Sequence, residues 1–324
     1  MEGNSKWIQV IVRSVTFEAK DVNSWEFCRP NGADLPPFAA GAHIDLKLNN
    51  GIIRSYSLCN AQDERDRYVI AVNKDPASRG GSKGIHENLK VGDEIAISPP
   101  SNNFPLVEDA KHVAFIAGGI GITPLWCMIQ RLEKLGRSWE LYYSARNRHA
   151  CAFKEKLETL ERQKPGRISF NFDQEPGGKV TDLEVLIDKI PNHTELYCCG
   201  PGAMLRAFET AARESKRHNA RVHVEYFTAK DVPASYGGFT LVLARSGRTF
   251  EVPVGKTILN TLLDNNIDVP FACMEGACGT CEIRVVEGIP DHRDSVLTAS
   301  ERSSNETIMI CCSGCKSAKL VLDL

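Results

Sequence analysis

Apolar and polar positions alternate along several short segments of the first hundred residues. This period of two is typical of strands with one face in a core and the other toward solvent. Turn-rich stretches such as RPNGADLPP and LNNG separate the segments. We therefore predict a small antiparallel β-barrel or sandwich over residues 1–105, with strands at Trp7–Val15, His43–Leu48, Ile52–Leu58, Arg67–Val72 and Glu94–Ile97.

The pattern changes near Pro105, because the next segment, Val113–Ala117, is uniformly apolar, as expected of a strand buried on both faces. Helical and strand patterns then alternate, which indicates a parallel sheet with helices on both faces over residues 106–228. Helices are predicted at Thr123–Leu135, Phe153–Gln163, Asp182–Lys189 and Ala203–Lys216. Further strands are predicted at Glu140–Ser144, Ile168–Phe172, Glu195–Cys199 and Arg221–Glu225.

Residues 229–236 lack periodicity and carry Pro and small polar residues, so they are predicted to be a linker. Beyond them, residues 237–324 form a third region of α+β type. It begins with a hairpin-like pair of strands, continues with a short helix and ends with another strand. These elements are predicted at Phe239–Leu243, Arg248–Val252, Thr257–Asn265 and Lys319–Leu324.

Composition narrows the class of protein. Hydrophobic residues make up 42% of the 324 positions and charged residues 25%, with a net charge of -2, which excludes disorder and a generally basic nucleic-acid binder. No apolar run approaches a membrane span of about 20 residues, and the N-terminus lacks a signal-peptide pattern. We expect a cytoplasmic protein, where 12 cysteines serve metal or redox chemistry more often than disulfides.

The segment CMEGACGTC places Cys273, Cys278 and Cys281 in a C-x4-C-x2-C array, and Cys311 follows in IMICCSGC. This is the plant-type 2Fe-2S spacing, in which a glycine-rich loop supplies three thiolates and a distant segment the fourth. Two other interpretations remain open from the residues. The thiols could be buried free cysteines, or Cys278-x2-Cys281 and Cys312-x2-Cys315 could hold structural zinc.

A glycine-rich turn, FIAGGIGITPLWCM, follows the first buried strand and opens a helix. Gly118, Gly119 and Gly121 permit a tight turn at which a pyrophosphate can approach the backbone and the positive helix end. Thr123 is predicted to cap this helix, and Pro124 stands where a missing N–H is harmless. The alternative is an ordinary strand-to-helix turn. A second strand ends in Cys199-Gly200-Pro201, and ligands of parallel sheets bind at such strand ends.

The third region resembles a plant-type ferredoxin domain of β-grasp type, and in that resemblance Cys311 is the fourth ligand. The two turns resemble GGxGxTP and CGPxxM, the motifs of the nicotinamide-nucleotide domain in the ferredoxin–NADP reductase superfamily. The resemblance implies that Cys199 lies beside the nicotinamide ring, and that Ser144 and Arg146 lie near the adenosine ribose. The sequence has no obvious second basic residue for a 2′-phosphate, so NADH is favoured over NADPH.

A flavin is expected because a nicotinamide gives up two electrons and an iron–sulfur cluster accepts one. Arg54-Ser55-Tyr56-Ser57 matches the R-x-Y-S flavin motif of the same superfamily. The resemblance places Tyr56 against the isoalloxazine, Ser57 near N5 and Arg54 near phosphate. A half-buried strand is the alternative. Arg79, Gly80, Gly81 and Ser82 follow, at a position where the superfamily binds flavin phosphate. The alternative for this loop is a surface turn.

Two residues near the end of the second region complete the expected site. By the resemblance, Phe227 shields the flavin face where nicotinamide enters, and Glu225 polarises that pocket. The alternative for the aromatic residue is simple packing at a domain boundary. The expected catalytic residues are Ser57, Cys199 and Glu225.

The order of flavin barrel, nicotinamide domain and ferredoxin domain resembles the phthalate dioxygenase reductase family. This resemblance implies FMN, a 2Fe-2S cluster and NADH as cofactors, and a terminal oxygenase of Rieske type as partner of a monomeric reductase. Residues 237–324 carry 8 Lys and Arg against 11 Asp and Glu, which favours docking on a basic partner. The alternatives are a reductase for a cytochrome P450 and a non-catalytic zinc- or nucleotide-binding module.

Overall fold

The computed structural model describes residues 7–49, 51–78, 80–215, 221–228 and 238–324. The chain divides into two compact units, residues 1–225 and 226–324, which are considered separately below. The linker predicted at 229–236 and Arg79 lie outside the described residues. The predicted domain limits at 105/106 and 228/237 remain predictions.

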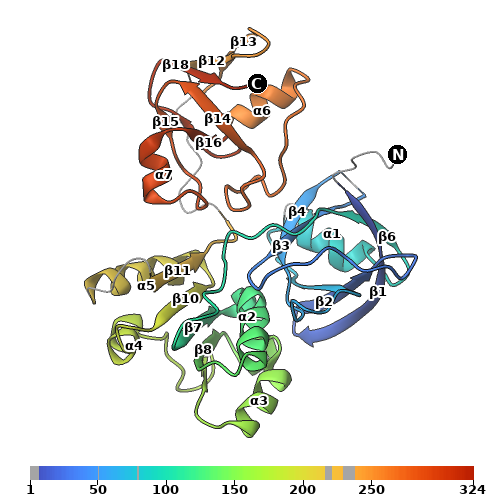
Figure 1. The fold of residues 1–324 in the computed structure, drawn as a ribbon, viewed down its shortest axis with the longest axis vertical. Helices are drawn as coiled ribbons and strands as arrows, with labels where there is room; N and C mark the ends of the chain where they lie inside the picture. The colour runs from blue at the N-terminus through green and yellow to red at the C-terminus, as the bar shows by residue number, and fades with distance from the viewer. Residues whose placement is uncertain (1–6, 50, 79, 216–220, 229–237) are drawn as a thin grey trace. The chain divides into compact units, whose positions relative to one another are not determined.

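The first unit begins with a six-stranded antiparallel sheet in the order β4-β3-β6-β1-β2-β5 (Figure 1). The two outer strands also meet, because Leu58 bridges to Ile70 and the Cys59 N–H donates to Val69 O at 2.8 Å, so the sheet closes into a barrel. Its strands are β1 (Ile8–Ala19), β2 (Val22–Cys28), β3 (His43–Lys47), β4 (Ile53–Ser57), β5 (Tyr68–Asn73) and β6 (Glu94–Ile97).

Two elements of the barrel were not predicted. Strand β2 was missed although it alternates, and helix α1 (Gly81–Asn88) was expected only as a phosphate loop. The helix follows Gly80, whose φ of 90° is a left-handed conformation that glycine adopts without a Cβ clash. The flavin-loop glycines therefore stand at a helix N-terminus.

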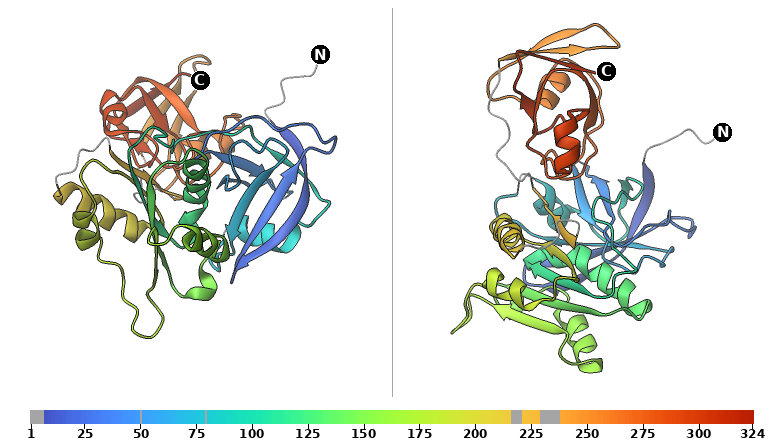
Figure 2. Two further views of the ribbon diagram at one scale, coloured as in Figure 1. Left: turned by 60° about the horizontal axis from the view of Figure 1, so that its bottom comes forward. Right: turned by 60° about the vertical axis from the view of Figure 1, so that its left-hand side comes forward.

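A five-stranded parallel sheet follows, in the order β11-β10-β7-β8-β9. Chain order reverses between β7 and β10, and such a switch point opens a crevice beyond the carboxyl ends of the strands. The strands are β7 (Val113–Gly118), β8 (Trp139–Ala145), β9 (Ile168–Phe172), β10 (Glu195–Cys199) and β11 (Val222–Glu225). The helices are α2 (Ile122–Lys134), α3 (Lys154–Gln163), α4 (Leu183–Lys189) and α5 (Gly202–Glu214), and they cover both faces (Figure 2).

One expectation about α2 was wrong. Thr123 does not cap the helix, because the helix begins one residue earlier and the capping position is Gly121. The Thr123 hydroxyl instead donates at 2.9 Å to Ile120 O, in the 3-10 turn Gly119–Gly121 that precedes the helix. The buried face of α2 explains the change, since Ile122 and Thr123 are both enclosed in the core.

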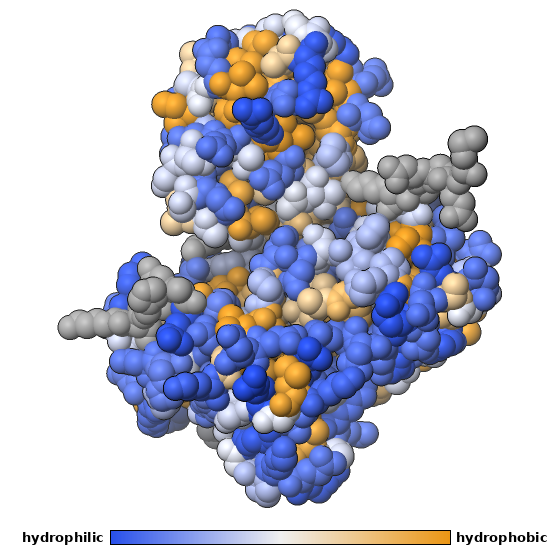
Figure 3. Space-filling view, viewed as in Figure 1, coloured by the Kyte–Doolittle hydropathy of each residue, from blue (hydrophilic) through white to orange (hydrophobic). Residues whose placement is uncertain are grey.

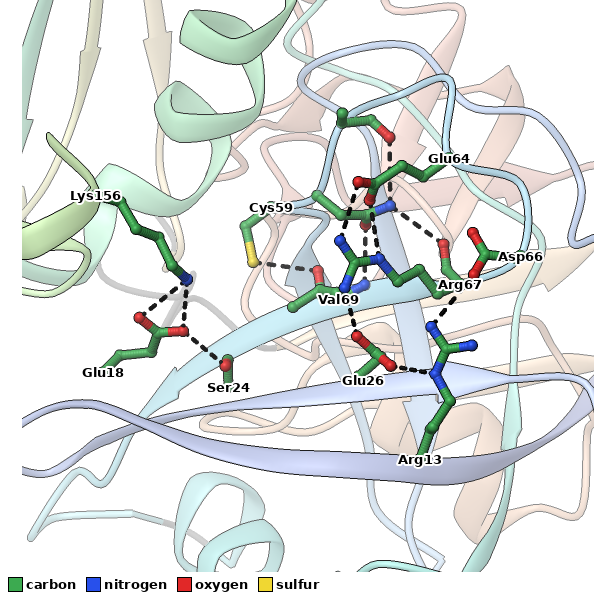
Figure 4. A network of polar contacts seen from close by, with 12 residues as sticks. Arg13, Glu18, Ser24, Glu26, Cys59, Glu64, Asp66, Arg67, Val69 and Lys156 are labelled. Carbon is green, nitrogen blue, oxygen red and sulfur yellow. Dashed lines mark hydrogen bonds and ion pairs between the residues drawn. The ribbon is translucent and has the colours of Figure 1, made fainter. Parts of the chain in front are cut away.

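A polar contact joins the barrel to helix α3, beside the parallel sheet (Figure 4). Lys156 of α3 donates to Glu18 of β1 at 2.9 Å, and Glu18 also accepts from Ser24. On the barrel itself, Arg13 and Arg67 both pair with Glu26. The two sheets also share one hydrophobic core, so the packing fixes the position of the barrel relative to the parallel sheet within this unit.

The second unit is a mixed five-stranded sheet in the order β13-β12-β18-β14-β16, together with a two-stranded ladder and helices α6 and α7. Among the described strands of this unit, only β12 and β18 pair in parallel. The elements are β12 (Phe239–Leu243), β13 (Thr249–Val252), α6 (Ile258–Asp264), β14 (Glu282–Glu287), β15 (Pro290–Asp291), α7 (Ala299–Ser304), β16 (Thr307–Met309), β17 (Gly314–Cys315) and β18 (Lys319–Leu322). The elements from β14 to β17 were not among those predicted from the sequence.

Surface polarity differs between the units on the face that Figure 3 shows. Hydrophilic residues cover most of the first unit there, and apolar areas are more frequent on the second. Among the described helices, none is long and apolar enough to cross a bilayer.

Candidate functional site

The two predicted nucleotide turns lie directly against one another at the switch point of the parallel sheet. A Cβ on Gly121 would stand 2.2 Å from Cys199 O, and a Cβ on Gly118 would stand 2.7 Å from Pro201 Cδ. Gly200 is equally close, because a Cβ there would lie 3.0 Å from Gly118 Cα. Both turns therefore need glycine for backbone contact with each other, a requirement that separate motifs in a sequence do not reveal.

A further residue supports this turn. Gly119 has a φ of 53°, and its carbonyl accepts a hydrogen bond of 3.0 Å from the buried Tyr143 hydroxyl on β8. The turn then enters α2, where unpaired backbone N–H groups and the helix dipole favour an anion. Sequence reasoning missed Tyr143, because its side chain reaches the turn only through the pairing of β7 with β8.

The three expected catalytic residues come together in the first unit. Cys199 and Glu225 are register partners on β10 and β11, with Cys199 Sγ 4.0 Å from Glu225 Oε2. Ser57, at the end of β4, hydrogen-bonds to the Glu225 carboxyl. The set thus spans barrel and parallel sheet, which the chain separates by more than 140 positions in sequence.

Burial controls the charge of this set. Desolvation raises the pKa of Glu225 to about 8, against a smaller lowering by the Ser57 hydrogen bond. Desolvation, followed by the neighbouring Glu225, also raises the pKa of Cys199 well above its usual value. Near neutral pH the pair is therefore a thiol beside a largely protonated carboxyl, and the pocket carries little net charge.

This pKa predicts a pH-dependent effect of Glu225→Gln. Between about pH 4.5 and 8 the folded state keeps a proton that the unfolded state releases, so wild-type stability falls as pH rises. Glutamine has no such loss. From pH 6 to pH 9 we expect the variant to gain about 2–4 °C in midpoint relative to wild type, roughly 1 kcal/mol after a discount for partial exposure.

Tryptophan fluorescence can follow this unfolding, since all four tryptophans lie in the first unit. Glu175→Gln is the matched control. Arg148 lowers the pKa of Glu175, through a backbone hydrogen bond and then a side-chain one, so this substitution should give no gain between pH 6 and 9. Equal pH profiles for wild type and Glu225→Gln would contradict the assignment.

Two of the expected flavin residues, Arg54 and Gly81, lie against each other. Arg54 lies on the flavin-loop glycine, because a Cβ on Gly81 would stand 2.9 Å from Arg54 Cγ. Ser82 Oγ accepts from the Asp75 N–H at 3.2 Å, and desolvation raises the pKa of Tyr56. The arginine of the R-x-Y-S strand and the N-terminus of α1 therefore form one cationic corner.

A second residue that sequence reasoning missed stands beside this strand. His43 of β3 is the register partner of Ser57 and is only 6% exposed. Desolvation lowers the pKa of His43, against a smaller effect of Asp45. The alternation of β3 does not indicate it, because the pattern places His43 and Asp45 on the polar face opposite Ile44 and Leu46, which is expected to face solvent.

The remaining nucleotide and flavin predictions are less tightly placed. Ser144 Oγ lies 2.9 Å from Thr181 Oγ1, which also accepts from Asn171, so Ser144 belongs to a polar network at the ends of β8 and β9. Arg146 is exposed. Phe227 belongs to the second unit, and its contact with the flavin stays a prediction.

The four predicted cluster ligands are buried. Cys273, Cys278, Cys281 and Cys311 expose 6%, 5%, 3% and 5% of their surface. The Cys273 thiol contacts those of Cys278 and Cys311, and the Glu275 N–H donates to Cys273 Sγ at 3.3 Å. Among the described residues, no group of three or more His, Cys, Asp or Glu is arranged around a single ion.

The alternative thiols have other partners. Cys315 Sγ donates to Ser317 O at 3.1 Å, and Cys312 Sγ lies 3.8 Å from Met309 O while also contacting Cys311. The loop glycine Gly276 has a φ of 66° and leaves no room for a Cβ, which would stand 2.5 Å from Cys312 Sγ. Four buried thiols around a glycine-rich loop fit an iron–sulfur cluster.

Family models match two parts of the chain. Residues 241–316 match a 2Fe-2S iron-sulfur cluster binding domain, and residues 115–210 match an oxidoreductase NAD-binding domain. The first match supports the cluster interpretation over buried free thiols and structural zinc, and the second supports a nucleotide turn over an ordinary one.

Relatives match over nearly the whole length. Tetrachlorobenzoquinone reductase of Sphingobium chlorophenolicum is 49% identical over 320 residues, which are 98% of each chain. A solved phthalate dioxygenase reductase, described as a modular structure for electron transfer from pyridine nucleotides to 2Fe-2S, is 39% identical with a TM-score of 0.74, again over 98% of each chain. An intact type IV self-sufficient cytochrome P450 monooxygenase is 36% identical with a TM-score of 0.85, over 98% of this chain and 41% of its own.

Full-length similarity to a reductase of the same architecture confirms the predicted fold class of barrel, α/β nucleotide domain and ferredoxin domain. The chain is an electron-transfer oxidoreductase, and it belongs to the phthalate dioxygenase reductase family.

Proposed function

We propose that this protein passes electrons from NADH, through FMN and a 2Fe-2S cluster, to the terminal component of an aromatic-ring dioxygenase or O-demethylase. The observation that carries the proposal is the meeting of Ser57, Glu225 and Cys199 at the switch point of the parallel sheet. This meeting supports a single site shared by the flavin motif and the nicotinamide motif. The four buried thiols supply the second redox centre.

When bound, the flavin would accept hydride and the cluster would carry single electrons. The protein's own residues bind and position. The dinucleotide binds at the N-terminus of α2. The residues that receive it are the turns at Gly118–Gly121 and Cys199–Pro201, with Thr123 and Pro124 in the first turn of the helix. Ser57 donates a hydrogen bond near flavin N5. The Cys199–Glu225 pair carries little net charge, so the pocket can accept a neutral or a cationic nicotinamide ring.

For the adenosine end, we propose Ser144 as a ribose contact and the exposed Arg146 as its neighbour. The adjacent groove is lined by Arg206 as well as by Asp182 and Glu184, so its charge does not select between NADH and NADPH, and the proposal of NADH rests on the sequence. Phe227 is proposed to cover the flavin ring until nicotinamide enters.

Arg54→Gln tests the proposed flavin phosphate corner. Arg54 lies against Gly81 at the N-terminus of α1, where charge and helix dipole act together on a phosphate. We propose that backbone N–H groups of the flavin loop donate to the flavin phosphate. The loop comprises Gly80, Gly81 and Ser82, together with Arg79, which lies outside the described residues. We expect FMN to bind about 10-fold more weakly, roughly 1.4 kcal/mol, as measured by fluorescence of released flavin.

Arg13→Gln is the control for this substitution, since Arg13 pairs with Glu26 and Asp66 on the barrel. It should retain wild-type flavin content. Equal flavin affinity in wild type and Arg54→Gln would remove Arg54 from the proposed phosphate site.

We propose that the partner is a Rieske-type terminal oxygenase and that the reductase is a monomer working in the reducing cytoplasm. The predicted ferredoxin region, residues 237–324, supports a docking role, since its net charge is -3 from 8 basic and 11 acidic residues. It also exposes apolar side chains, including Met274 of the cluster loop at 38%.

The whole proposal is tested by a visible spectrum of the purified protein with flavin extraction, iron and acid-labile sulfide analysis, and NADH-dependent reduction of cytochrome c. We expect one FMN and two irons with two sulfides per chain. A protein without flavin, or with zinc in place of iron and sulfide, would refute it.

A reductase for a cytochrome P450 is the second candidate, and the similarity to a self-sufficient P450 monooxygenase favours it. Reconstitution separates the two. Turnover with a purified Rieske oxygenase but not with a P450 supports the first function, and the reverse supports the second.

A further inference from the structure

A buried polar cluster in the second unit is not used by the proposed electron path. Asp294 is completely buried, and its Oδ2 accepts from the Val296 and Leu297 N–H groups at 3.1 and 2.8 Å. Arg302 of α7 donates to Asp294 O, and its Nη2 lies 3.7 Å from Asp294 Oδ2. Burying a carboxylate costs desolvation free energy unless partners compensate for it, so the position of Asp294 requires an explanation.

Asp294 lies against the cluster loop. The φ of 66° at Gly276 brings the loop so close that a Cβ there would stand 3.1 Å from Asp294 Cα. The next residue, Ser295, holds the Gly276 carbonyl twice, through its N–H at 2.8 Å and its hydroxyl at 3.2 Å. Gly276 lies between the predicted ligands Cys273 and Cys278 in sequence. The Asp294 carboxylate therefore holds the turn at residues 294–297, and Ser295 of that turn holds the cluster loop at Gly276.

Part of the hydrogen-bonding capacity of this cluster is unused. Within the described residues, Asp294 Oδ1, both ring nitrogens of His292 and Arg302 Nε have no hydrogen-bond partner. His292 Nδ1 lies 3.9 Å from Asp294 Oδ1. A purely structural turn cap would need neither the free oxygen nor a buried histidine beside it.

We propose that Asp294, with Arg302 as its counter-ion and His292 as its neighbour, is a positioning residue that sets the reduction potential of the cluster. The proposal rests on the proposed cluster at Cys273, Cys278, Cys281 and Cys311. Charge and hydrogen bonding around the ligands set iron–sulfur potentials. A buried negative charge behind the loop disfavours the added electron, and Arg302 moderates that effect.

The test separates charge from shape. Asp294→Asn keeps an oxygen for the two backbone N–H groups but removes the charge and leaves Arg302 uncompensated. In the full-length holoprotein we expect the equilibrium to shift about 10-fold toward the reduced cluster, which is about 59 mV for one electron. Arg302→Gln should shift it the opposite way. The potentials are measured by spectroelectrochemical titration, with the EPR signal of the reduced cluster.

Asp323→Asn is the matched control, because Asp323 forms an ion pair with Arg245 on the exposed surface of the same unit, and it should leave the potential unchanged. Wild-type potentials in both Asp294→Asn and Arg302→Gln, or shifts of the same sign in the two, would overturn the proposal. Should Asp294→Asn not fold, Arg302→Gln against Asp323→Asn still decides. A wild-type protein without cluster absorbance would instead refute the proposed function.

Discussion

Replacing Cys311 with serine is expected to remove the cluster and to lower NADH-dependent cytochrome c reduction by at least about 100-fold, or about 2.7 kcal/mol in barrier. The Cys311 thiol contacts that of Cys273 in a buried set of four, and a serine oxygen is a harder and weaker ligand for iron than a thiolate. Reduction of ferricyanide, which can take electrons from the flavin, should persist. Iron content and visible absorbance measure the loss directly.

Cys312→Ser and Cys315→Ser are the matched controls for this prediction. Cys315 donates to Ser317 O, and Cys312 lies near Met309 O, so neither thiol is needed as a ligand. Both variants should keep two irons per chain and wild-type cytochrome c reduction. Cluster loss in Cys312→Ser with retention in Cys311→Ser would mean that the fourth ligand has been wrongly chosen between two adjacent thiols.

Gly121→Ala is expected to produce the second large effect. The new methyl group would stand 2.2 Å from Cys199 O and 2.6 Å from Gly200 N, and these backbone atoms cannot move without disturbing both nucleotide turns. We expect about 3 kcal/mol of destabilisation, a fall of roughly 6–12 °C in midpoint. The KM for NADH should rise at least about 10-fold, because the turn that receives the pyrophosphate and the Cys199 strand end are displaced together.

Gly136→Ala controls for the backbone effect of the substitution. Gly136 follows α2 with a φ of 63°, and a Cβ there would meet no atom within 4 Å. It should lower the midpoint by only about 2–4 °C, the result of roughly 1 kcal/mol of left-handed strain, and leave the KM for NADH unchanged. An unchanged KM in Gly121→Ala would show that the contact between the two turns does not shape the nucleotide site.

Local patterns predicted much of the fold because regular alternation and uniform apolar runs decide secondary structure locally. Strands β6, β9, β10 and β12 have the predicted limits. The patterns failed where the element depends on a distant partner. Helix α1 has a glycine-rich start, and β15, β16 and β17 have only two or three residues each, so none of these elements shows a clear period. Strand β14 was missed although its first residues alternate.

The sequence by itself determined the order of the three modules and the chemistry each contains, because the cysteine spacing, the two turns and the R-x-Y-S strand are short motifs whose residues act through local backbone geometry. Only the tertiary structure decided which of these residues meet. Ser57 reaches Glu225 because the barrel packs on the parallel sheet, and Gly121 touches Cys199 because β7 pairs with β10. Asp294 faces Gly276 for the same reason, since long-range contacts arise from packing and leave no mark in nearby residues.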